Sequence, residues 1–253
     1  MPLIHNVHIR FYGDLGIFLE PSQRGRCFVY QIKGCPAVKD TLEALGVPHV
    51  AIDAILINGC SRNFSCQLKE GDQVLVYPPL YRRRIRGAIH LARLPRKIRF
   101  VIDSHLGKLV RHLRLLGFDA VYKNVFPDRE IADIAARQRR IVLTRDKGLL
   151  KYRCLKWGYW VRSPDPAQQV REVIRRYDLW KHIRPFSLCV ECGGQISRVA
   201  KKDIINQLPP KTRLCYNKFF RCRRCRHVYW RGSHYAKLIL FIQRLKKRRE
   251  RAQ

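Results

Sequence analysis

The first part of the chain alternates apolar and polar residues in a way that predicts a small sheet with one helix. Residues 6–12 alternate, as a half-buried strand does. Apolar stretches at 27–32, 54–57 and 73–77 predict three more strands, and 37–46 reads as a short helix closed by a glycine. The order strand, strand, helix, strand, strand is typical of a β-grasp fold, an α+β arrangement.

Further along, the periodicity changes and predicts strands that alternate with helices. Three short apolar runs predict strands, and each is followed by apolar residues at helical spacing. The expected strands are 98–102, 141–144 and 158–161, and the expected helices are 106–117, 128–139 and 166–177. Repeated strand–helix units indicate a parallel sheet with helices on its faces, so the overall class is α/β.

These patterns divide the chain into five consecutive parts. We expect a β-grasp domain, a basic linker, an α/β domain, a cysteine-containing module and a basic tail, at residues 1–79, 80–97, 98–182, 183–235 and 236–253. The tail has apolar residues that would form one face of a helix and pack on the body or on a partner: Leu238, Ile239, Phe241, Ile242 and Leu245.

The apolar runs also bear on location. No apolar run approaches the roughly 18 residues that suggest a membrane span. The start of the chain lacks a basic segment followed by an apolar one, which is the mark of a secretion signal. We therefore expect a cytoplasmic protein with no membrane partner, whose paired cysteines bind metal instead of forming disulfides.

The size and distribution of the positive charge indicate that the chain binds a polyanion. The net charge is +33, yet residues 1–79 carry seven basic and seven acidic residues. The whole excess therefore lies in residues 80–253. Such one-signed charge repels itself, and a polyanion relieves the repulsion and adds counterion release. Nucleic acid is the favoured partner, ahead of an anionic membrane, because the basic residues are spread over folded segments.

Two pairs of cysteines predict a metal site. Cys189 and Cys192 form one CxxC pair, Cys222 and Cys225 form another, and 29 residues separate the pairs. Each two-residue gap lets a tight turn present both sulfurs to one ion, and four thiolates complete a tetrahedral Zn²⁺ site with no open position. The expected role is structural. The remaining cysteines lack paired spacing and read as small buried residues: Cys27, Cys35, Cys60, Cys66, Cys154 and Cys215.

Aromatic and basic residues are interleaved around these cysteines. The rings are Tyr216, Phe219, Phe220, Tyr229, Trp230 and Tyr235. Aromatic faces stack on unpaired bases and arginines bind phosphate, so Arg223, Arg224 and Arg231 are candidate RNA contacts. The alternative is that the rings form the core of a small ribbon, and we expect both roles, for different rings. His227 is expected at the surface or on RNA, although it could replace a sulfur ligand.

Carboxylates are scarce in the basic part, which makes their positions informative. Asp103 ends one predicted strand, Asp146 follows another, and Asp128 opens a helix. Carboxyl ends of parallel strands meet at one edge of a sheet, where ligands bind. Three carboxylates gathered there would repel each other unless a hard divalent cation such as Mg²⁺ or Mn²⁺ joined them. Such ions support phosphodiester cleavage.

Each of these aspartates also has a structural alternative. Asp128 suits the cap of its helix, because aspartate favours that position, and Asp146 suits pairing with Arg145 or capping the helix that begins near Lys147. Asp103, at the end of an apolar strand, is the hardest to explain without a ligand. Lys108 and Arg145 are candidates for contacting phosphate near the metal, with solvated surface charge as the alternative.

Taken together, these segments resemble the Mut7-C family along almost the whole chain. The N-terminal similarity rests on residues 38–49, 57–59, 70–72 and 76–78. The central similarity rests on Asp103, on 106–109 and 113–119, and on 143–150 with its Leu-Thr-Arg-Asp sequence; the C-terminal similarity rests on both CxxC pairs and 229–235.

The resemblance implies an RNase domain related to PIN-domain nucleases, with a ubiquitin-like β-grasp domain before it. It implies catalytic roles for Asp103, Asp128 and Asp146, with Glu130 as a further acidic residue close to a Mg²⁺ or Mn²⁺ ion. Asp133 and Asp165 are weaker candidates. The expected substrate is a structured RNA such as tRNA, rRNA or the ribosome, and the β-grasp domain is expected to bind a protein partner.

Two other functions remain open from the sequence alone. A non-catalytic RNA- or ribosome-binding factor would use the same basic surface and ribbon, with aspartates that only cap or pair. A DNA-binding zinc protein is a weaker alternative, because the sequence has no obvious recognition helix for the major groove.

Overall fold

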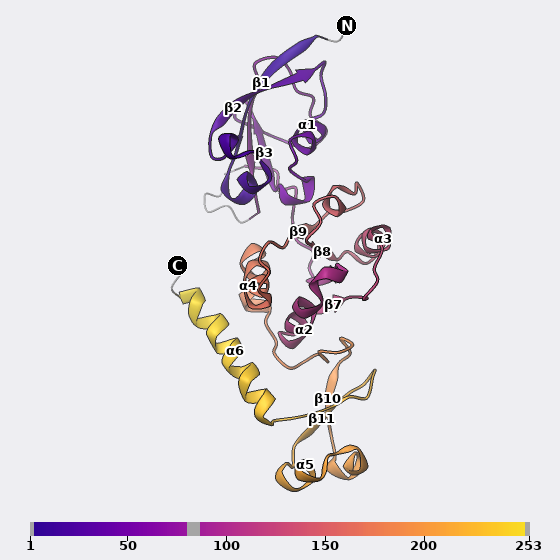
Figure 1. Cartoon of the computed structure of the whole chain (residues 1–253). Helices are drawn as coiled ribbons and strands as arrows, with labels where there is room; N and C mark the ends of the chain where they lie inside the picture. The colour runs from indigo at the N-terminus through magenta and orange to yellow at the C-terminus, as the bar shows by residue number, and fades with distance from the viewer. Residues whose placement is uncertain (1–2, 80–86, 251–253) are drawn as a thin grey trace.

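A computed structural model describes residues 3–79 and 87–250 of the chain. Figure 1 shows three parts in succession: an N-terminal sheet at one end, a parallel sheet in the middle and a cysteine-bearing ribbon at the other end. The mixed α/β architecture expected from the sequence is confirmed. Residues 80–86 of the expected basic linker, with Arg82, Arg83 and Arg84, lie outside the described residues.

The N-terminal part is a five-stranded sheet crossed by one helix. Its strands are β1 (Ile4–Phe11), β2 (Cys27–Lys33), β3 (Ala54–Ile57), β4 (Cys60–Arg62) and β5 (Gln73–Tyr77), in the order β2-β1-β5-β3-β4. β1 and β5 are parallel and central, and α1 (Val38–Ala44) packs against them. β4 was not expected. It exists because Asn58 and Gly59 both have positive φ and reverse the chain directly after β3.

The middle part is a four-stranded, fully parallel sheet between helices. Its strands are β6 (Arg99–Ile102), β7 (Asp119–Val121), β8 (Ile141–Thr144) and β9 (Gly158–Trp160), in the order β7-β6-β8-β9; its helices are α2 (Gly107–Leu115), α3 (Asp128–Gln138) and α4 (Pro166–Arg176). Phe100 and Ile102 pack toward α2 and α4, whereas Val101 packs toward α3. The strands are apolar on both faces because helices cover both.

Short 3-10 helices join these elements. They are η1 (Gly13–Phe18), η2 (Pro21–Gln23), η3 (His49–Ala51), η4 (Ser104–Leu106), η5 (Leu149–Lys151), η6 (Leu179–His182), η7 (Lys201–Asp203) and η8 (Ile205–Gln207). Of these, η4 and η5 follow β6 and β8 at the carboxyl edge of the parallel sheet. Asp103 lies directly before η4, and Asp146 lies three residues before the start of η5.

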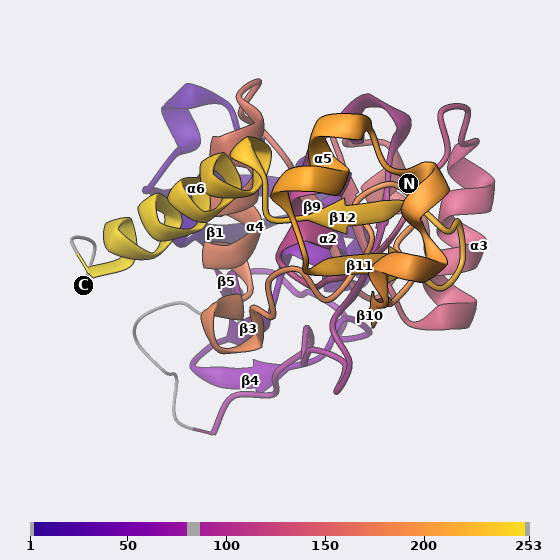
Figure 2. The same cartoon turned by 90° about the horizontal axis from the view of Figure 1, so that it is seen from below.

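The third part is an antiparallel ribbon followed by a long helix. The ribbon strands are β10 (Ile196–Val199), β11 (Phe219–Cys222) and β12 (Val228–Trp230), with α5 (Pro210–Cys215) between the first two. Helix α6 (Ser233–Glu250) then runs back along α4, as Figures 1 and 2 both show. Its apolar side chains at Leu238, Phe241, Ile242 and Leu245 pack on the core of the middle part.

Two further observations correct or extend the sequence-based expectations. The expectation that the unpaired cysteines are buried is wrong: Cys66 is partly exposed, and the others are exposed, namely Cys27, Cys35, Cys60, Cys154 and Cys215. Cys27 and Cys60 lie at strand ends, Cys215 at the end of α5 and the others in loops, and all of these positions face solvent. Within the described ranges, no helix is long and apolar enough to cross a bilayer.

A tight joint at Gly117 connects the parallel sheet to the ribbon. Gly117 follows the last turn of α2 with a φ of +89°, and a Cβ there would lie 2.3 Å from the carbonyl oxygen of Arg184. The backbone amides of Arg184 and Phe186 donate to the carbonyls of Leu116 and Leu115. The end of α2 is thereby fixed to the segment that leads into the ribbon.

The N-terminal part is bound to the middle part through a buried cation. Arg176, in the last turn of α4, is 5% exposed; it pairs with Asp14 at 3.2 Å and donates to the carbonyl oxygen of Ala51 at 2.9 Å. His49 Nε2 lies 2.8 Å from the carbonyl oxygen of Leu155 and makes a second link. The two parts therefore share a polar interface as well as apolar contacts.

We expect Arg176→Ala to lower the free energy of unfolding by about 2–4 kcal/mol, because it removes a buried ion pair and leaves a buried carbonyl without its donor. The neighbouring variant Arg175→Ala, at an exposed position, is the control and should change it by less than about 0.5 kcal/mol. Urea unfolding followed by tryptophan fluorescence measures both. Equal effects of the two variants would contradict this role of Arg176.

Candidate active site and metal centre

Asp103 lies at the carboxyl end of β6, where it is 4% exposed and surrounded by donors. The hydroxyl of Thr144 donates to Asp103 Oδ2 at 2.7 Å, and the hydroxyl of Ser104 donates to Oδ1 at 3.1 Å. The ring Nδ1 of His105 lies 3.1 Å from the same Oδ1. Burial would raise the pKa of Asp103, but these hydrogen bonds outweigh it and hold the pKa below its ordinary value. Asp103 is therefore an ionised carboxylate in a fixed orientation.

Thr144 connects Asp103 to Asp146. The Thr144 side chain is fully buried at the end of β8; while its hydroxyl donates to Asp103, its oxygen accepts from the backbone amide of Asp146 at 2.8 Å. Asp146 in turn accepts from the amide of Gly148 at 2.7 Å, and a Cβ on Gly148 would lie only 3.2 Å from Asp146 Oδ1. One buried hydroxyl thus fixes the positions of two acidic residues that follow adjacent strands.

Asp128 completes the acidic group from the first turn of α3. Partial burial and the charges of Asp146 and Asp103 raise the pKa of Asp128, while the charge of His105 lowers it by less. Because the charges of Asp103 and Asp146 act on Asp128, the three aspartates share one electrostatic environment. A cation at this edge would relieve their repulsion.

The geometry of this group is looser than that of a preformed metal cage. Within residues 3–79 and 87–250, the only group of three or more candidate ligand side chains brought close together is the cysteine group described below. Glu130 forms an ion pair with Lys123 instead of approaching the aspartates directly. Asp165 caps α4 by accepting from the amide of Ala167 at 3.1 Å, and Asp133 is exposed on α3.

The two basic residues expected near the acidic group lie on elements that begin there. Lys108 is exposed in the first turn of α2, five residues after Asp103. Arg145 directly precedes Asp146, is exposed, and donates to the carbonyl oxygen of Ser163 at 3.4 Å. In the sequence, each of them lies within five residues of Asp103 or Asp146. Neither forms a salt bridge with Asp103, Asp128 or Asp146.

The raised pKa of Asp128 predicts a pH dependence of stability in protein free of Mg²⁺ and Mn²⁺. The folded state binds this proton more tightly than the unfolded state, so the stabilisation is present at low pH. It is lost as the pH rises from about 3.9 through the raised folded pKa.

Urea unfolding of wild type and Asp128→Asn across this range checks the sign. The wild-type free energy of unfolding should fall relative to that of the variant as the pH rises. Asp146→Asn should make the fall smaller. A difference between wild type and Asp128→Asn that does not change with pH would contradict the repulsion.

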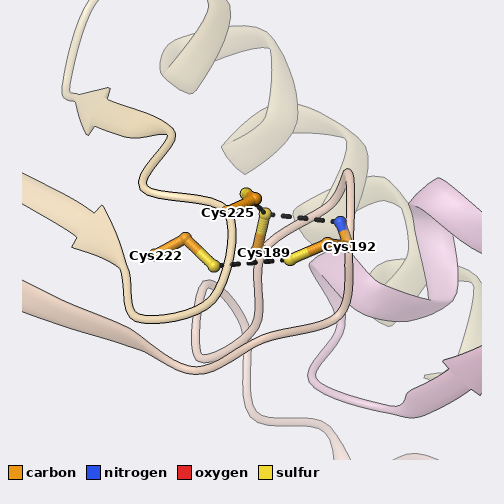
Figure 3. A group of neighbouring side chains, drawn as sticks. All are labelled: Cys189, Cys192, Cys222 and Cys225. Atoms are coloured by element: carbon orange, nitrogen blue, oxygen red, sulfur yellow. Dashed lines mark hydrogen bonds between the residues drawn. The ribbon is translucent and has the colours of Figure 1, made fainter.

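The second site is the cysteine group, drawn in Figure 3. The turn before β10 presents Cys189 and Cys192, and the turn between β11 and β12 presents Cys222 and Cys225; all four sulfurs lie within 4.8 Å of one another. Cys189 and Cys225 are 3.5 Å apart, and Cys192 and Cys222 are 3.4 Å apart. Four sulfurs around one Zn²⁺ at about 2.3 Å are spaced by a similar distance, so the group fits a tetrahedral zinc ion.

Backbone amides prepare these sulfurs to carry charge. The amides of Cys192, Gly194 and Arg224 donate to sulfurs at 3.3–3.5 Å. Although burial alone would raise the pKa of Cys222, hydrogen bonds from neighbouring amides and thiols lower it to about 6. The hydroxyl of Tyr229 lies 3.0 Å from Cys189 Sγ, within hydrogen-bonding distance. A zinc ion held by four thiolates here would have no open position for a substrate.

Arg114 fastens this centre to the parallel sheet. Its side chain is buried on α2, donates to the carbonyl oxygen of Ala120 at 3.1 and 2.9 Å, and also donates to the carbonyls of Val190 and Glu191 inside the first cysteine turn. Because this one guanidinium contacts both, a well-ordered first cysteine turn depends on the middle part. The position of the Arg114 side chain depends in turn on the cysteine turn.

The aromatic residues of the ribbon divide between a core and a surface, as expected. Phe219 is fully buried with Ile204 and Leu208, and Tyr216 and Trp230 pack against it. Phe220 and Tyr229 are neighbours across the strand pair and are not part of that core. Arg223, Arg224 and Arg231 are exposed, and His227 lies beside the ring of Tyr229 instead of among the sulfurs.

Comparison with known families decides the identity. A family described as the Mut7-C RNAse domain matches residues 98–242, which is more than half of the chain. The chain belongs to the Mut7-C RNase family. A second Mut7-C description, the Mut7-C ubiquitin domain, matches residues 4–84. The resemblance seen in the sequence is confirmed for both parts, and the family is one of ribonuclease-related, RNA-associated proteins. No curated protein matches the chain.

The Mut7-C match extends from β6 into α6, so it includes the acidic group and the cysteine group. The sequence did not reveal Thr144, His105 or Arg114. The signal for Thr144 was its place two residues before Asp146, at the end of a buried strand. For Arg114 it was a charge directly between the buried residues Leu113 and Leu115.

Proposed function

We propose that this chain is a metal-dependent ribonuclease that cuts within a structured cellular RNA. The observation that carries the proposal is the link from Asp103 through the buried Thr144 hydroxyl to Asp146, with Asp128 electrostatically coupled to both. A buried hydroxyl that positions two carboxylates at the edge of a parallel sheet, in a chain of charge +33, is typical of a ligand-binding site.

Asp103, Asp128 and Asp146 would hold Mg²⁺ or Mn²⁺. Oxygen donors suit these ions, and the raised pKa of Asp128 reflects a repulsion that a cation would remove. The bound ion would supply Lewis-acid activation of water and stabilisation of charge on the phosphate. Asp103 keeps its charge and orientation because Thr144 and Ser104 donate to it. Glu130 would influence the metal site only indirectly, because it forms an ion pair with Lys123.

Basic side chains would hold the substrate on either side of this edge. Lys108 and Arg145 would contact phosphates near the cleaved bond, and Arg223, Arg224 and Arg231 would contact the RNA from the ribbon. Zn²⁺ bound by the four cysteines would be structural. We propose tRNA, rRNA or the ribosome as the RNA partner, and the cytoplasm as the location.

The N-terminal part is proposed to bind a protein partner instead of carrying sulfur or being conjugated. Carrier chemistry needs a free C-terminal Gly-Gly, whereas here β5 ends in Tyr77 and continues through Pro78 and Pro79. We keep the division into domains at 1–79, 98–182 and 183–235 as a working proposal, with 80–97 as linker and 236–253 as a tail that begins inside α6.

A second candidate function is a non-catalytic RNA- or ribosome-binding factor. One observation favours it: within the described part of the chain, the aspartates are not gathered as closely as the cysteines. The two functions differ in what happens to bound RNA. Zinc-loaded protein should cleave a structured RNA mixture when Mg²⁺ or Mn²⁺ is added and only bind it when neither is present. Binding without cleavage at every metal concentration would favour the second function.

A further inference from the structure

A groove of about 1400 Å³ separates α2 from the ribbon. Its walls come from α2, from the segment around Phe186, from β11 and β12, and from the beginning of α6. Figure 2, which views the molecule from the ribbon end, shows β11 and β12 in front of α2. The groove is distinct from the acidic group, because none of Asp103, Asp128 and Asp146 lines it.

One wall of the groove begins at Lys108, five residues after Asp103 in the sequence. Lys108, Arg111, His112 and Leu115 all line it, and their spacing of three and four residues places them on one face of α2. The helix rises about 1.5 Å per residue, so this face extends about 10 Å from the end near Asp103 to the joint at Gly117. A strand of nucleic acid lying along it would reach the acidic group at the Lys108 end.

The remaining walls are rich in aromatic faces. Phe220 and Tyr229 lie opposite each other on β11 and β12, outside the ribbon core. The rings of Phe186 and Tyr235 are 4.7 Å apart, and the guanidinium of Arg231 lies 5.4 Å from the centre of the Tyr235 ring. These rings are partly exposed and line the groove, so they are available to a flat ligand.

The charge of the groove identifies the class of ligand. Five lining side chains are lysine or arginine, namely Lys108, Arg111, Lys211, Arg231 and Lys237. The one lining carboxylate is Glu191, and Arg111 already pairs with it. Aromatic faces combined with an uncompensated basic rim suit bases and phosphates together. A peptide would pack against the rings, but only a strongly acidic peptide would neutralise the positive charge of the rim.

We propose that this groove binds an unpaired segment of the RNA next to the cleaved bond. This inference rests on the proposed ribonuclease function and adds a specificity to it. The bases of the segment stack on Phe220, Tyr235 and their neighbours, and its phosphates meet the basic rim. Bases in a duplex cannot do this, because their faces are covered by stacking within the helix. The enzyme therefore cuts beside single-stranded regions of a structured RNA.

The test uses full-length, zinc-loaded protein without added Mg²⁺ or Mn²⁺, so that RNA is bound and not cut. Fluorescence anisotropy measures the affinity for a labelled, unpaired oligoribonucleotide of about 12 nucleotides and for a blunt RNA duplex. Phe220→Ala and Tyr235→Ala should each weaken binding of the unpaired RNA by about 5- to 100-fold. Binding of the duplex should change by less than about twofold, because phosphate contacts dominate it.

Three controls keep the result interpretable. Phe220→Trp and Tyr235→Phe retain a ring and should bind the unpaired RNA about as well as the wild type. The unchanged duplex affinity of the alanine variants separates loss of stacking from loss of the fold. Tyr152→Ala removes a ring that is 38% exposed and outside the groove, and should have no effect. Zinc content and thermal unfolding of each variant check that the ribbon is intact. Equal loss of duplex and unpaired binding, or no loss of either, would overturn the proposal.

The outcomes also separate this proposal from the ribonuclease proposal. If the alanine variants lose unpaired binding but the wild type never cleaves with Mg²⁺ or Mn²⁺, the groove stands and the catalytic function fails. If the variants bind and cleave unpaired RNA as the wild type does, the catalytic function stands and the groove fails.

Discussion

Asp103→Asn is expected to reduce RNA cleavage by about 100- to 1000-fold, which corresponds to about 3–4 kcal/mol of lost transition-state stabilisation. Asparagine removes the one carboxylate whose charge and orientation the structure fixes most firmly. It is the aspartate that is buried and that Thr144, Ser104 and His105 all approach. RNA affinity should change by less than about threefold, because binding depends on basic residues spread over the surface. Single-turnover cleavage and filter binding measure the two quantities.

The matched control is Asp165→Asn. Asp165 caps α4, and asparagine caps a helix equally well, so this variant should fold and cleave like the wild type. Thermal unfolding of Asp103→Asn must be followed as well, because the variant loses a charged acceptor of the Thr144 hydroxyl; about 1–3 kcal/mol of destabilisation is expected. If folded Asp103→Asn cleaves RNA at the wild-type rate, the acidic group is not the catalytic site.

Cys222→Ser is expected to abolish stoichiometric zinc binding and to unfold the ribbon. Structural zinc sites contribute about 10–16 kcal/mol of binding free energy, far more than a small ribbon gains from burying Ile204, Leu208 and Phe219. Loss of the metal should also loosen the cysteine turn that Arg114 holds, so protease cleavage should appear near residues 188–194. Metal analysis of purified protein and limited proteolysis followed by mass spectrometry measure both effects.

Cys215→Ser is the control for that variant. Cys215 belongs to the same part of the chain but is exposed and is not one of the four grouped cysteines. It should retain one zinc ion per chain and resist protease as the wild type does. Full zinc content in Cys222→Ser would contradict a four-cysteine centre, and equal loss in both variants would point to a general effect of removing thiols.

The long, periodic segments were predictable from the sequence because each element satisfies its own pattern. The strand at 141–144 and the helix at 166–176 were expected almost to the residue, since every residue of the first is buried and one face of the second is. β4 and β7 were missed. Each has three residues, too few for alternation to be visible, and β7 exists because β6 provides a partner at Arg99–Val101. Such strands depend on their neighbours instead of on their own residues.

The candidate sites follow the same rule. The cysteine ligands were predictable because a two-residue gap is a local requirement of the metal site. The positions of Asp103 and Asp146 at the same edge were predictable because the ends of parallel strands share one edge of a sheet. Thr144 and Arg114 were not, because their roles consist of contacts with residues 41 and 76 positions away in the sequence. The groove likewise joins α2 to a ribbon about 100 residues further on.

The most direct test of the central claim is RNA cleavage by zinc-loaded protein from which Mg²⁺ and Mn²⁺ have been removed, with each ion then added back and Asp146→Asn assayed alongside. Asp146 is exposed, so its replacement perturbs folding less than that of Asp103. The account predicts that wild-type protein cleaves structured RNA only after Mg²⁺ or Mn²⁺ is added, and that Asp146→Asn binds the same RNA without cleaving it. Tight binding with no cleavage by the wild type at any concentration of either ion would contradict it.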